Sequence, residues 1–521
     1  ALEMARSNLV EGAVPRTLAD LVLTRLSGLP ASTRALVRWA AVMEWGPIAA
    51  LQDACCEEVV DFVGAFETAA RYGLVRLEPA LNGSDSFAMA HSLIQRVVYE
   101  NVSALRRAAM HRTAAEVLSK KPQGASRTST IAYHASRADR PDLAARALID
   151  GALDAAALGA VREAGELADR SLELLPRLEP EVASSVELGA LLVLAQVRRP
   201  AEPARFVTRL TELGLAALDQ RRTEEARRAF HAASHLRWEA GASHEGYGLA
   251  RQAWHAAGAG DAAQRTRASS LMALCLALME KQLPDAQALV HEAEALAQVD
   301  KSVPEPTELV LARGLLHFHA GRISEARRDA TDAQLLARMS HNLLQEASAL
   351  LMLLQLEHVS HQPQASSAAA QTLLSLSSKM REGGEGALAA AGLSLAEEDL
   401  GLARVGLEKA LTQLGRLDDK RRRAWVANRW AHRERLSGSA EAALGLARSA
   451  LESALAVEAW SEAAIAACEL MATALLMSDD QSYVEAEAVL ADCEARGTLS
   501  YEARRLIEET TTTADASQAS Q

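Results

Sequence analysis

The chain has 521 residues, which is too long for one ordinary hydrophobic core, so we expect several domains or a repeat array. Hydrophobic residues make up 49% of the chain but aromatic residues only 4%, a composition that favours long helices packed closely through alanine and leucine. The formal net charge of −13 argues against a general nucleic-acid-binding protein, because such a protein must neutralise phosphates.

The cysteines and the apolar runs bear on the compartment. Five cysteines are scattered without a Cys-x-x-Cys pair, as is typical of reduced thiols in a cytoplasmic protein. They are Cys55, Cys56, Cys275, Cys468 and Cys493. We find no signal peptide and no uninterrupted apolar run of membrane length, so we expect a cytoplasmic protein without a membrane segment. The chain begins at Ala1 without a methionine, which suggests a fragment of a longer protein.

Residues 14–91 predict a small domain of three helices and two strands. Glycines end the helices in turn, and the segments 74–78 and 86–90 alternate as strands around an Asn82-Gly83 turn signal. Apolar residues at helical spacing mark the helices: Leu18, Leu21, Val22 and Leu26; Leu36, Val37, Ala40 and Met43; Val59, Phe62, Val63 and Phe66. Three helices followed by a two-stranded wing make a winged helix.

Many winged helices bind DNA through the third helix, so the charge of that helix matters. Here it carries four acidic residues against the lone Arg71. The acidic residues are Glu57, Glu58, Asp61 and Glu67. A helix that enters a DNA groove must neutralise phosphates, and this one would repel them. We therefore expect a structural and regulatory winged helix that makes no direct contact with nucleic acid.

Residues 131–509 are repetitive, and this decides the expected architecture. Glu-Ala or a close variant recurs before helices rich in alanine and leucine; Ala286 and Ala326, for example, lie 40 positions apart. This period suits the antiparallel helix pairs of a TPR-like α-solenoid, so the fold class is predicted to be all-α. Residues 92–130 are expected to form connecting helices and a polar linker, and residues 510–521 a disordered tail.

The segment Phe87–Tyr99 is predicted to form a strand, then His91, then an amphipathic helix. It resembles the end of the winged helix in STAND-type signalling ATPases, where a Met-His-Asp-like motif lets a histidine sense the nucleotide phosphates. Here Ala90 lies between Met89 and His91, and Ser92 stands in the place of the acidic residue.

The stretch Tyr99–Leu118 is similar to the one that follows the winged helix in large ATP-binding LuxR-type transcriptional regulators of the maltotriose-activator type. Leu21–Leu29 resembles their entry to this module. The resemblance implies that residues 1–13 follow an upstream ATPase core, and that ATP or ADP binds only to that core. His91 would then contact nucleotide only when the core is present.

The same resemblance implies that the repeats bind an inducer or an inhibitory partner, and that the winged helix relays this binding to the core. The chain departs from the full family pattern in two ways. It contains no GxxxxGK[ST] phosphate-binding loop, and no DNA-binding helix-turn-helix follows residue 500.

Residues 231–255 are dense in histidine and aromatic side chains. His231 and His235 lie one helical turn apart, a spacing that can chelate a metal, but the sequence fixes no third ligand, so we predict no metal site. The aromatic side chains would supply contact area for a ligand or peptide, or else pack between repeats. The residues assigned to a binding surface are His231, His235, Trp238, Tyr247 and Trp254.

Residues 420–435 form the most basic segment that also contains aromatic side chains. This segment could dock an acidic partner surface or an anionic ligand. The residues concerned are Arg421, Arg422, Trp425 and Arg429. The alternative is a solvated helix face, with Trp425 and Leu436 pointing inward and the arginines on the solvent side.

No catalytic set is supported by the sequence, and the glycine-rich Gly383–Gly386 lacks the lysine of a phosphate loop, so we expect no enzyme. The sequence predicts the sensor region of a signal-transduction ATPase that controls transcription, with a small-molecule inducer or a regulatory protein on its repeats. Two alternatives stay open: a stand-alone TPR-like scaffold for protein–protein interaction, and the sensor half of an ATP-linked kinase or cyclase regulator. A homo-oligomer is compatible with each.

Overall fold

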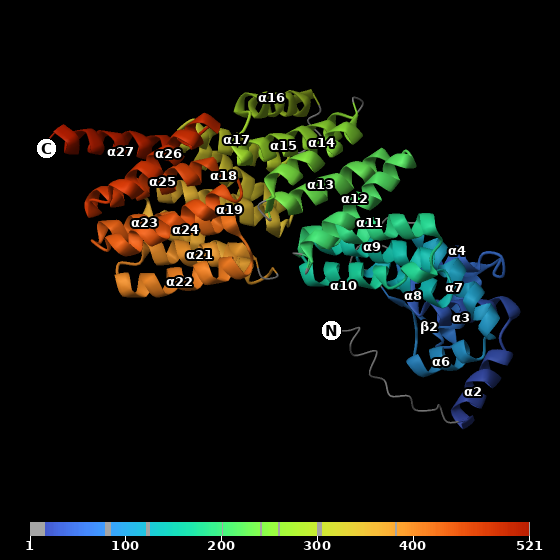
Figure 1. The fold of residues 1–521 in the computed structure, drawn as a ribbon. Helices are drawn as coiled ribbons and strands as arrows, with labels where there is room; N and C mark the ends of the chain where they lie inside the picture. Colours follow the sequence, from blue (N-terminus) through green and yellow to red (C-terminus); the bar gives the residue numbers. More distant parts are fainter. Residues whose placement is uncertain are drawn as a thin grey trace. The chain divides into compact units, whose positions relative to one another are not determined.

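The protein is almost entirely helical and divides into two compact units, which are described separately (Figure 1). The first comprises residues 1–155 and 166–187, and the second residues 156–165 and 188–521. The computed structural model describes residues 16–78, 85–120, 125–198, 200, 202–239, 242–258, 261–299, 305–380, 383–496 and 498–519. The expected N-terminal segment 1–13 and the Asn82-Gly83 turn lie outside these ranges.

Helices and a small sheet make up the first unit. Its helices are α2 (Arg16–Ser27), α3 (Ala31–Met43), α4 (Ile48–Cys55), α5 (Phe62–Arg71), α6 (Ser92–Glu100), α7 (Ala104–Ser119), α8 (Ala125–Arg137) and α9 (Pro141–Ala157), the last ending just beyond the unit. Its strands are β1 (Trp45–Pro47), β2 (Val75–Glu78) and β3 (Ser86–Met89). They form an antiparallel sheet in the order β1-β3-β2, with Phe87 of β3 opposite both Gly46 and Leu77.

The core of the first unit lies between α3 and the sheet. Leu36, Val37 and Phe87 are fully buried there, as the helical and alternating patterns predict. The third predicted helix begins at Phe62, because Asp61 caps it by accepting a hydrogen bond from the Gly64 amide over 3.0 Å. The sequence reading missed β1 and α4, which are too short to show a periodic pattern.

Two histidines join α7 to α8. His111 Nδ1 lies 2.7 Å from His134 Nδ1, and His111 Nε2 lies 2.9 Å from the Tyr99 hydroxyl. Both rings are almost fully buried. Burial, together with nearby Arg137, lowers the pKa of His111 to about 4 and that of His134 to about 3, so both are neutral at pH 7. This contact ties α8 to the first unit, although the sequence places a polar linker up to residue 130.

Two further helices have residues in both units: α10 (Val161–Leu172) and α11 (Pro180–Val197). The short 3-10 helix η1 (Leu175–Arg177) belongs to the first unit. The remaining helices all belong to the second unit. They are α12 (Pro203–Asp219), α13 (Thr223–Glu239), α14 (Ser243–Ala257), α15 (Ala262–Met279), α16 (Leu283–Val299), α17 (Thr307–His319), α18 (Ile323–Met339), α19 (Leu343–Val359), α20 (Pro363–Ser377), α21 (Gly384–Ala396), α22 (Leu400–Arg416), α23 (Lys420–Leu436), α24 (Ala440–Leu455), α25 (Trp460–Met477), α26 (Asp480–Arg496) and α27 (Tyr501–Ala519).

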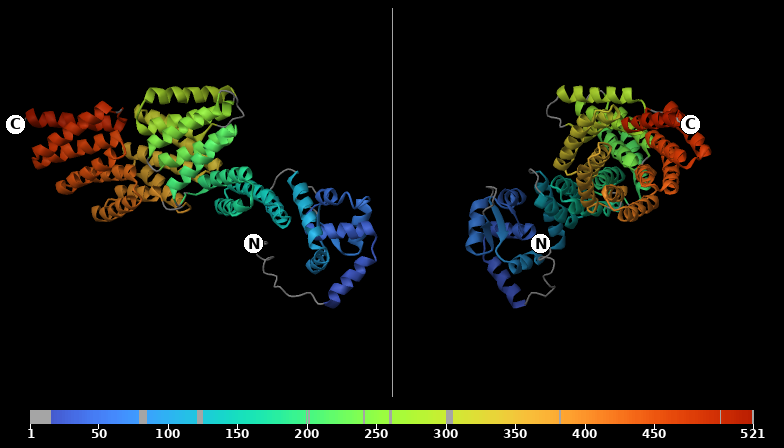
Figure 2. Two further views of the ribbon diagram at one scale, coloured as in Figure 1. Left: turned by 45° about the vertical axis from the view of Figure 1, so that its right-hand side comes forward. Right: turned by 90° about the vertical axis from the view of Figure 1, so that its left-hand side faces the viewer.

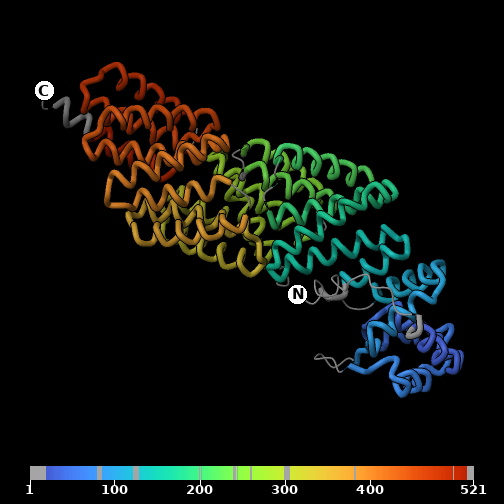
Figure 3. Tube along the Cα trace, turned by 90° about the horizontal axis from the view of Figure 1, so that it is seen from below, coloured from blue at the N-terminus to red at the C-terminus, as the bar shows by residue number. Residues whose placement is uncertain are grey.

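In the second unit each helix from α12 to α25 packs on the next along the chain, and the odd-numbered helices from α13 to α27 also pack on one another (Figure 3). The odd helices therefore form the inner layer and the even helices the outer layer, as in a solenoid of helix pairs. Ala226, Ala286 and Ala326 of the recurring Glu-Ala motif are completely buried, so their small side chains let neighbouring helices approach closely.

The inner layer curves until helices far apart in sequence touch. The Ser461 amide at the start of α25 donates to Glu280 Oε2 just after α15 over 2.9 Å, and the Thr498 amide before α27 donates to the Glu280 carbonyl over 3.4 Å. Arg504 of α27 also donates to the His319 carbonyl that ends α17, over 2.6 Å. The right-hand view of Figure 2 shows the red C-terminal helices beside the green ones. The second unit thus closes on itself; this row of contacts is called the seam below.

Among the residues that the structure describes, two helices have the length and mean hydropathy of a membrane span, although we expected no apolar run of that length: α11 and α25. Of the apolar window in α25, 72% is buried inside the protein, as expected for the core helix of a repeat. At the C-terminus, α27 extends to Ala519, over most of the segment for which composition predicts disorder. Thr510 and Thr512 there donate their hydroxyls to carbonyls one turn back, which is compatible with a helix.

Candidate binding site on the inner helices

A cavity of about 190 Å³, here called the central cavity, lies on the inner layer of the second unit. Inner helices from α13 to α27 contribute to it, so it faces the interior of the curve. One wall is apolar and comes from α15, α17, α19 and α21. Its side chains are Leu274, Leu278, Leu311, Leu315, Phe318, Leu351, Met352 and Leu388.

Another part of the lining is polar and comes from α23, the start of α25 and the start of α27. Its side chains are Arg421, Arg422, Trp425, Arg429, Ser461, Glu462, Ser500 and Glu502. An apolar wall that faces fixed charges is the usual composition of a ligand pocket, because the apolar surface supplies affinity and the polar groups orient the ligand.

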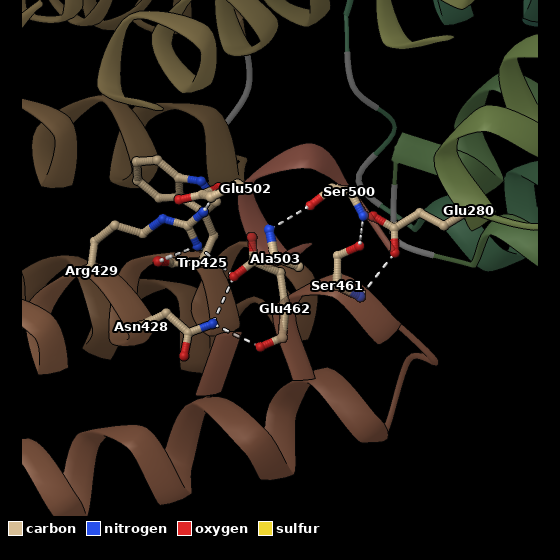
Figure 4. A network of polar contacts seen from close by, with 9 residues as sticks. All are labelled: Glu280, Trp425, Asn428, Arg429, Ser461, Glu462, Ser500, Glu502 and Ala503. Atoms are coloured by element: carbon tan, nitrogen blue, oxygen red, sulfur yellow. Dashed lines mark hydrogen bonds and ion pairs between the residues drawn. The ribbon is translucent and has the colours of Figure 1, made fainter. Parts of the chain in front are cut away.

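Arg429 is the centre of the polar wall (Figure 4). Its guanidinium donates to Glu462 Oε2 and to Glu502 Oε2, each over 2.5 Å, and lies 4.8 Å from the centre of the Trp425 ring. Asn428 Nδ2 also donates to Glu462 Oε2, over 2.7 Å. These residues are called the Arg429 network.

The Arg429 network is buried, and this sets its electrostatics. Burial would lower the pKa of the Arg429 guanidinium, but the two carboxylates raise it above its usual value, so the side chain stays charged. Burial raises the pKa of Glu502 in spite of the neighbouring arginine. One cation between two carboxyl groups leaves a net negative charge when both are ionised, and this favours a polar or cationic group on the ligand nearby.

The basic segment 420–435 does not form a solvated face. Arg429 is 6% exposed, whereas Leu436, which the alternative reading placed inward, is 69% exposed. The reason is that α23 belongs to the inner layer, where acidic side chains of α25 and α27 neutralise Arg429. Trp425 is buried, as that reading expected.

The other two assigned arginines of α23 also line the central cavity. Arg422 pairs with Asp419 over 2.5 Å and with the buried Glu385 over 3.1 Å. Arg421 donates a hydrogen bond to the Leu278 carbonyl at the end of α15. Arg421 therefore belongs both to the cavity and to the contact between distant helices.

The histidine- and aromatic-rich segment separates into three places. Trp238 lines the central cavity together with Leu274 and Leu278. It therefore shares a cavity with the arginines of α23, a relation that the sequence does not reveal. His231 and His235 line a second cavity on the inner layer. No group of three or more histidine, cysteine, aspartate or glutamate side chains is placed to hold a metal ion within the part of the chain that the structure describes.

Tyr247 and Trp254 lie away from the central cavity. They pack around a buried cluster that contains Leu271 and Cys275, between α14 and α15. The Trp254 indole donates to Ser269 Oγ over 3.2 Å. Their positions fit packing between repeats, the second of the two roles that the sequence left open for aromatic residues.

His91 caps α6 in the first unit. Its Nδ1 accepts a hydrogen bond from the Leu93 amide over 3.2 Å, and the side chain is exposed. Because Nδ1 is the acceptor, the proton of the neutral ring is on Nε2, which leaves an exposed donor.

Sequence reasoning missed the acidic residues Glu462 and Glu502 and the apolar wall around Leu315 and Phe318. The two glutamates lie in the first turns of ordinary alanine-rich helices, where acidic residues are common for helix-dipole reasons alone. Nothing in the sequence distinguishes them from a solvated pair.

Comparison with solved structures agrees with a helical solenoid. A Rap protein complexed with Competence and Sporulation Factor matches with a TM-score of 0.50 at 10% identity, over 70% of this chain and 99% of that one. Its fold is a TPR-type helical solenoid. No family model matches the chain, and neither does any curated protein sequence.

Two further structures resemble the chain at lower TM-scores. The STAND protein PH0952 from Pyrococcus horikoshii, which has a tetratricopeptide repeat sensor, matches with a TM-score of 0.41 at 11% identity, over 97% of this chain and 68% of that one. The APC/C hetero-tetramer Cut9–Hcn1 matches with a TM-score of 0.40 at 13% identity, over 80% of this chain and 85% of that one.

Proposed function

We propose that the second unit is a receptor that binds a partner peptide or a small inducer in the central cavity. The observation that carries this proposal is the meeting of an apolar wall from α15–α21 with the Arg429 network on the inner layer. TPR-type solenoids serve as interaction scaffolds, and the similar Rap protein was solved with Competence and Sporulation Factor. The ligand would carry an apolar group of modest size, because the cavity measures about 190 Å³.

The first unit would be the relay of this receptor. Its order of elements, with α3, α4 and α5 before β2 and β3, supports a winged helix. The resemblance of Phe87–Tyr99 and Tyr99–Leu118 supports a STAND ATPase of the LuxR type that controls transcription. In that setting an ATPase core outside this chain would bind ATP or ADP, and His91 would contact the nucleotide through its exposed ring.

A stand-alone scaffold and a kinase or cyclase regulator would bind their ligands in the same central cavity as a transcription-regulating ATPase. One binding experiment therefore tests the receptor role in all three cases. Random-peptide phage display and a metabolite panel are applied to the full chain and to Ser348→Trp. Ser348 lines the central cavity and is half-buried, so a tryptophan there would fill the cavity from the inner face of α19. Ligands selected on the unaltered chain should bind this variant at least about tenfold more weakly.

The matched control is Ser324→Trp, which places the same side chain on the exposed surface of the outer helix α18. This variant should bind as the unaltered chain does. Equal binding to Ser348→Trp, or no ligand from either panel, would contradict a receptor role for the central cavity.

A further inference from the structure

A second cavity of about 240 Å³ lies on the inner layer, at the N-terminal ends of α15, α17 and α19. It is called the arginine cavity here. Side chains from α11 and α13 complete it. The polar ones are Gln196, Arg227, Arg228, His231, His235, Arg267, Glu308, Asn342 and Gln345.

The arginine cavity is cationic. Three arginines line it, and Glu308 is the one acidic side chain among its described lining residues. Arg227 is buried and pairs with Glu224 over 2.8 Å. Arg228 and Arg267 are exposed at the edge of the cavity, and neither forms an ion pair with any residue the structure describes. Two guanidinium groups are therefore available to an incoming ligand.

Glu308 contributes one negative charge against the two guanidinium groups of Arg228 and Arg267, and it already has hydrogen-bond partners within the protein. His231 Nε2 and Gln345 Nε2 contact Glu308 Oε1 at 3.0 and 2.6 Å, and the residue is almost fully buried. Burial would raise the pKa of Glu308, but the hydrogen bond and charge of His231 outweigh it and lower the pKa to about 2. The carboxylate is thus held by internal partners, and no ion pair joins it to Arg228 or Arg267 among the residues that the structure describes.

The helix backbone also contributes positive charge to the arginine cavity. Arg267 lies in the second turn of α15, Glu308 in the first turn of α17, and Asn342 caps α19 by accepting from the Gln345 amide over 3.2 Å. Helix N-termini carry partial positive charge, so three of them at one cavity add to the field of the arginines. The combination of guanidinium groups, amide side chains and helix N-termini suits a carboxylate or a phosphate.

The arginine cavity and the central cavity are both lined by residues from one face of α13. Arg228, His231, His235 and Trp238 follow one another at intervals of three or four residues, so they share that face. The His235 and Trp238 rings are 4.8 Å apart, and Trp238 already lines the central cavity.

We propose that the arginine cavity binds the carboxylate or phosphate group of a ligand, whose remainder follows α13 towards Trp238. Arg228 and Arg267 bind the anion, and the amide side chains at the N-terminus of α19 complete the site. The anion site stands on its own, whereas the path towards Trp238 rests on the proposed function of the central cavity.

The test uses the full chain with two simple anions, inorganic phosphate and acetate, which separate the two sources of the charge. Each is titrated at constant ionic strength against chloride, and binding is followed by the rise in Tm. At least one anion should raise the Tm. In Arg228→Ala/Arg267→Ala the affinity for that anion should fall by about tenfold or more per arginine, the usual effect of losing a charge-assisted hydrogen bond.

Three controls make the outcome decisive. Arg251→Ala/Arg328→Ala removes the same charge from the exposed surfaces of the outer helices α14 and α18 and should leave anion binding unchanged. Arg228→Ala/Arg267→Ala should have the same Tm in chloride as the unaltered chain, because both arginines are exposed. Ser348→Trp should bind the anion normally, so failure of the central cavity and failure of the anion site are told apart. An equal loss in both double variants, or no rise with either anion, would overturn the proposal.

Discussion

At the scale of single residues, the Arg429 network shows what burial demands of a charged side chain. Glu462 and Glu502 lie 33 and 73 residues further along the chain, yet both bind the same guanidinium. Their removal from water is compensated only while all three groups are present, since a buried carboxylate without a partner is costly. Arg429 therefore serves stability as well as any ligand.

We predict that Arg429→Met lowers the free energy of unfolding of the second unit by about 3–5 kcal/mol, the cost of breaking a buried ion pair. Urea unfolding followed by tryptophan fluorescence measures this, because five of the seven tryptophans lie in the second unit. Arg416→Met, on the exposed end of α22, should change stability little. If Arg429→Met/Glu462→Gln/Glu502→Gln regains stability, the loss in Arg429→Met comes from the two carboxylates left without a partner. A loss of less than about 1 kcal/mol in Arg429→Met would contradict the buried ion-pair network.

The sequence revealed the residues of this site only in part. Composition singled out Trp238, Trp425 and Arg429, and the structure brings Trp238 and the α23 residues to one cavity. It could not reveal that Arg429 points inward, because orientation depends on which layer a helix joins. The same limit applies to Tyr247 and Trp254. Their aromatic side chains predict burial, but the sequence does not show whether a ligand or a neighbouring helix covers them.

At the scale of elements, helices with a sustained apolar period were predictable and short elements were not. α3 shows its buried face in the spacing of leucine, valine and methionine. In α5 the spacing correctly predicts the burial of Phe62, but Val63, which it placed on the same face, is exposed, and Ala65 and Ala69 are buried instead. β1 has three residues and gains its order from pairing with β3, which is a contact outside its own sequence. α8 was obscured by a polar composition, although His134 anchors it to α7.

The His111–His134 contact makes the junction of α7 and α8 sensitive to acid. An unfolded histidine has a pKa near 6.5, whereas the pKa values here are about 4 and about 3. As the pH falls below about 6.5 the unfolded state binds more protons than the folded one, so stability is full above that pH and is lost towards about pH 4.

We predict faster amide hydrogen exchange in α7 and α8 over this pH range, after correction for the intrinsic exchange rate. His134→Gln, which cannot be protonated, should flatten the dependence. His91→Gln changes an exposed histidine of the same unit and should leave it as steep as before. A dependence that is equally steep in all three proteins would exclude the buried pair as its cause.

At the scale of the whole second unit, the repeats were predictable as a class but the seam was not. Repeat periods report contacts between neighbours, whereas Glu280 and Ser461 are 181 positions apart. The seam depends on the accumulated rotation of many helix pairs, a quantity that no local pattern contains.

Opening the seam should loosen both of its sides together. Glu280→Asn tolerates the left-handed backbone at φ 56° but is too short to reach the Ser461 amide, and Arg504→Ala removes the bond to the His319 carbonyl. We predict faster hydrogen exchange in this double variant at the ends of α15 and α17 and at the starts of α25 and α27. The control variant Glu408→Ala/Arg416→Ala, on the exposed face of α22, should show no faster hydrogen exchange at these helix ends. Changes confined to one side would mean that the seam does not couple them.

The seam also restricts how this protein can change over evolution. An open repeat array can gain or lose one helix pair at little cost, because each pair meets only its neighbours. In the second unit an added pair between α15 and α25 would shift every later helix and separate Glu280 from Ser461. Its repeat number is therefore expected to be fixed, and diversity among its descendants should arise by substitution on the inner helices, while insertions should be confined to the outer turns.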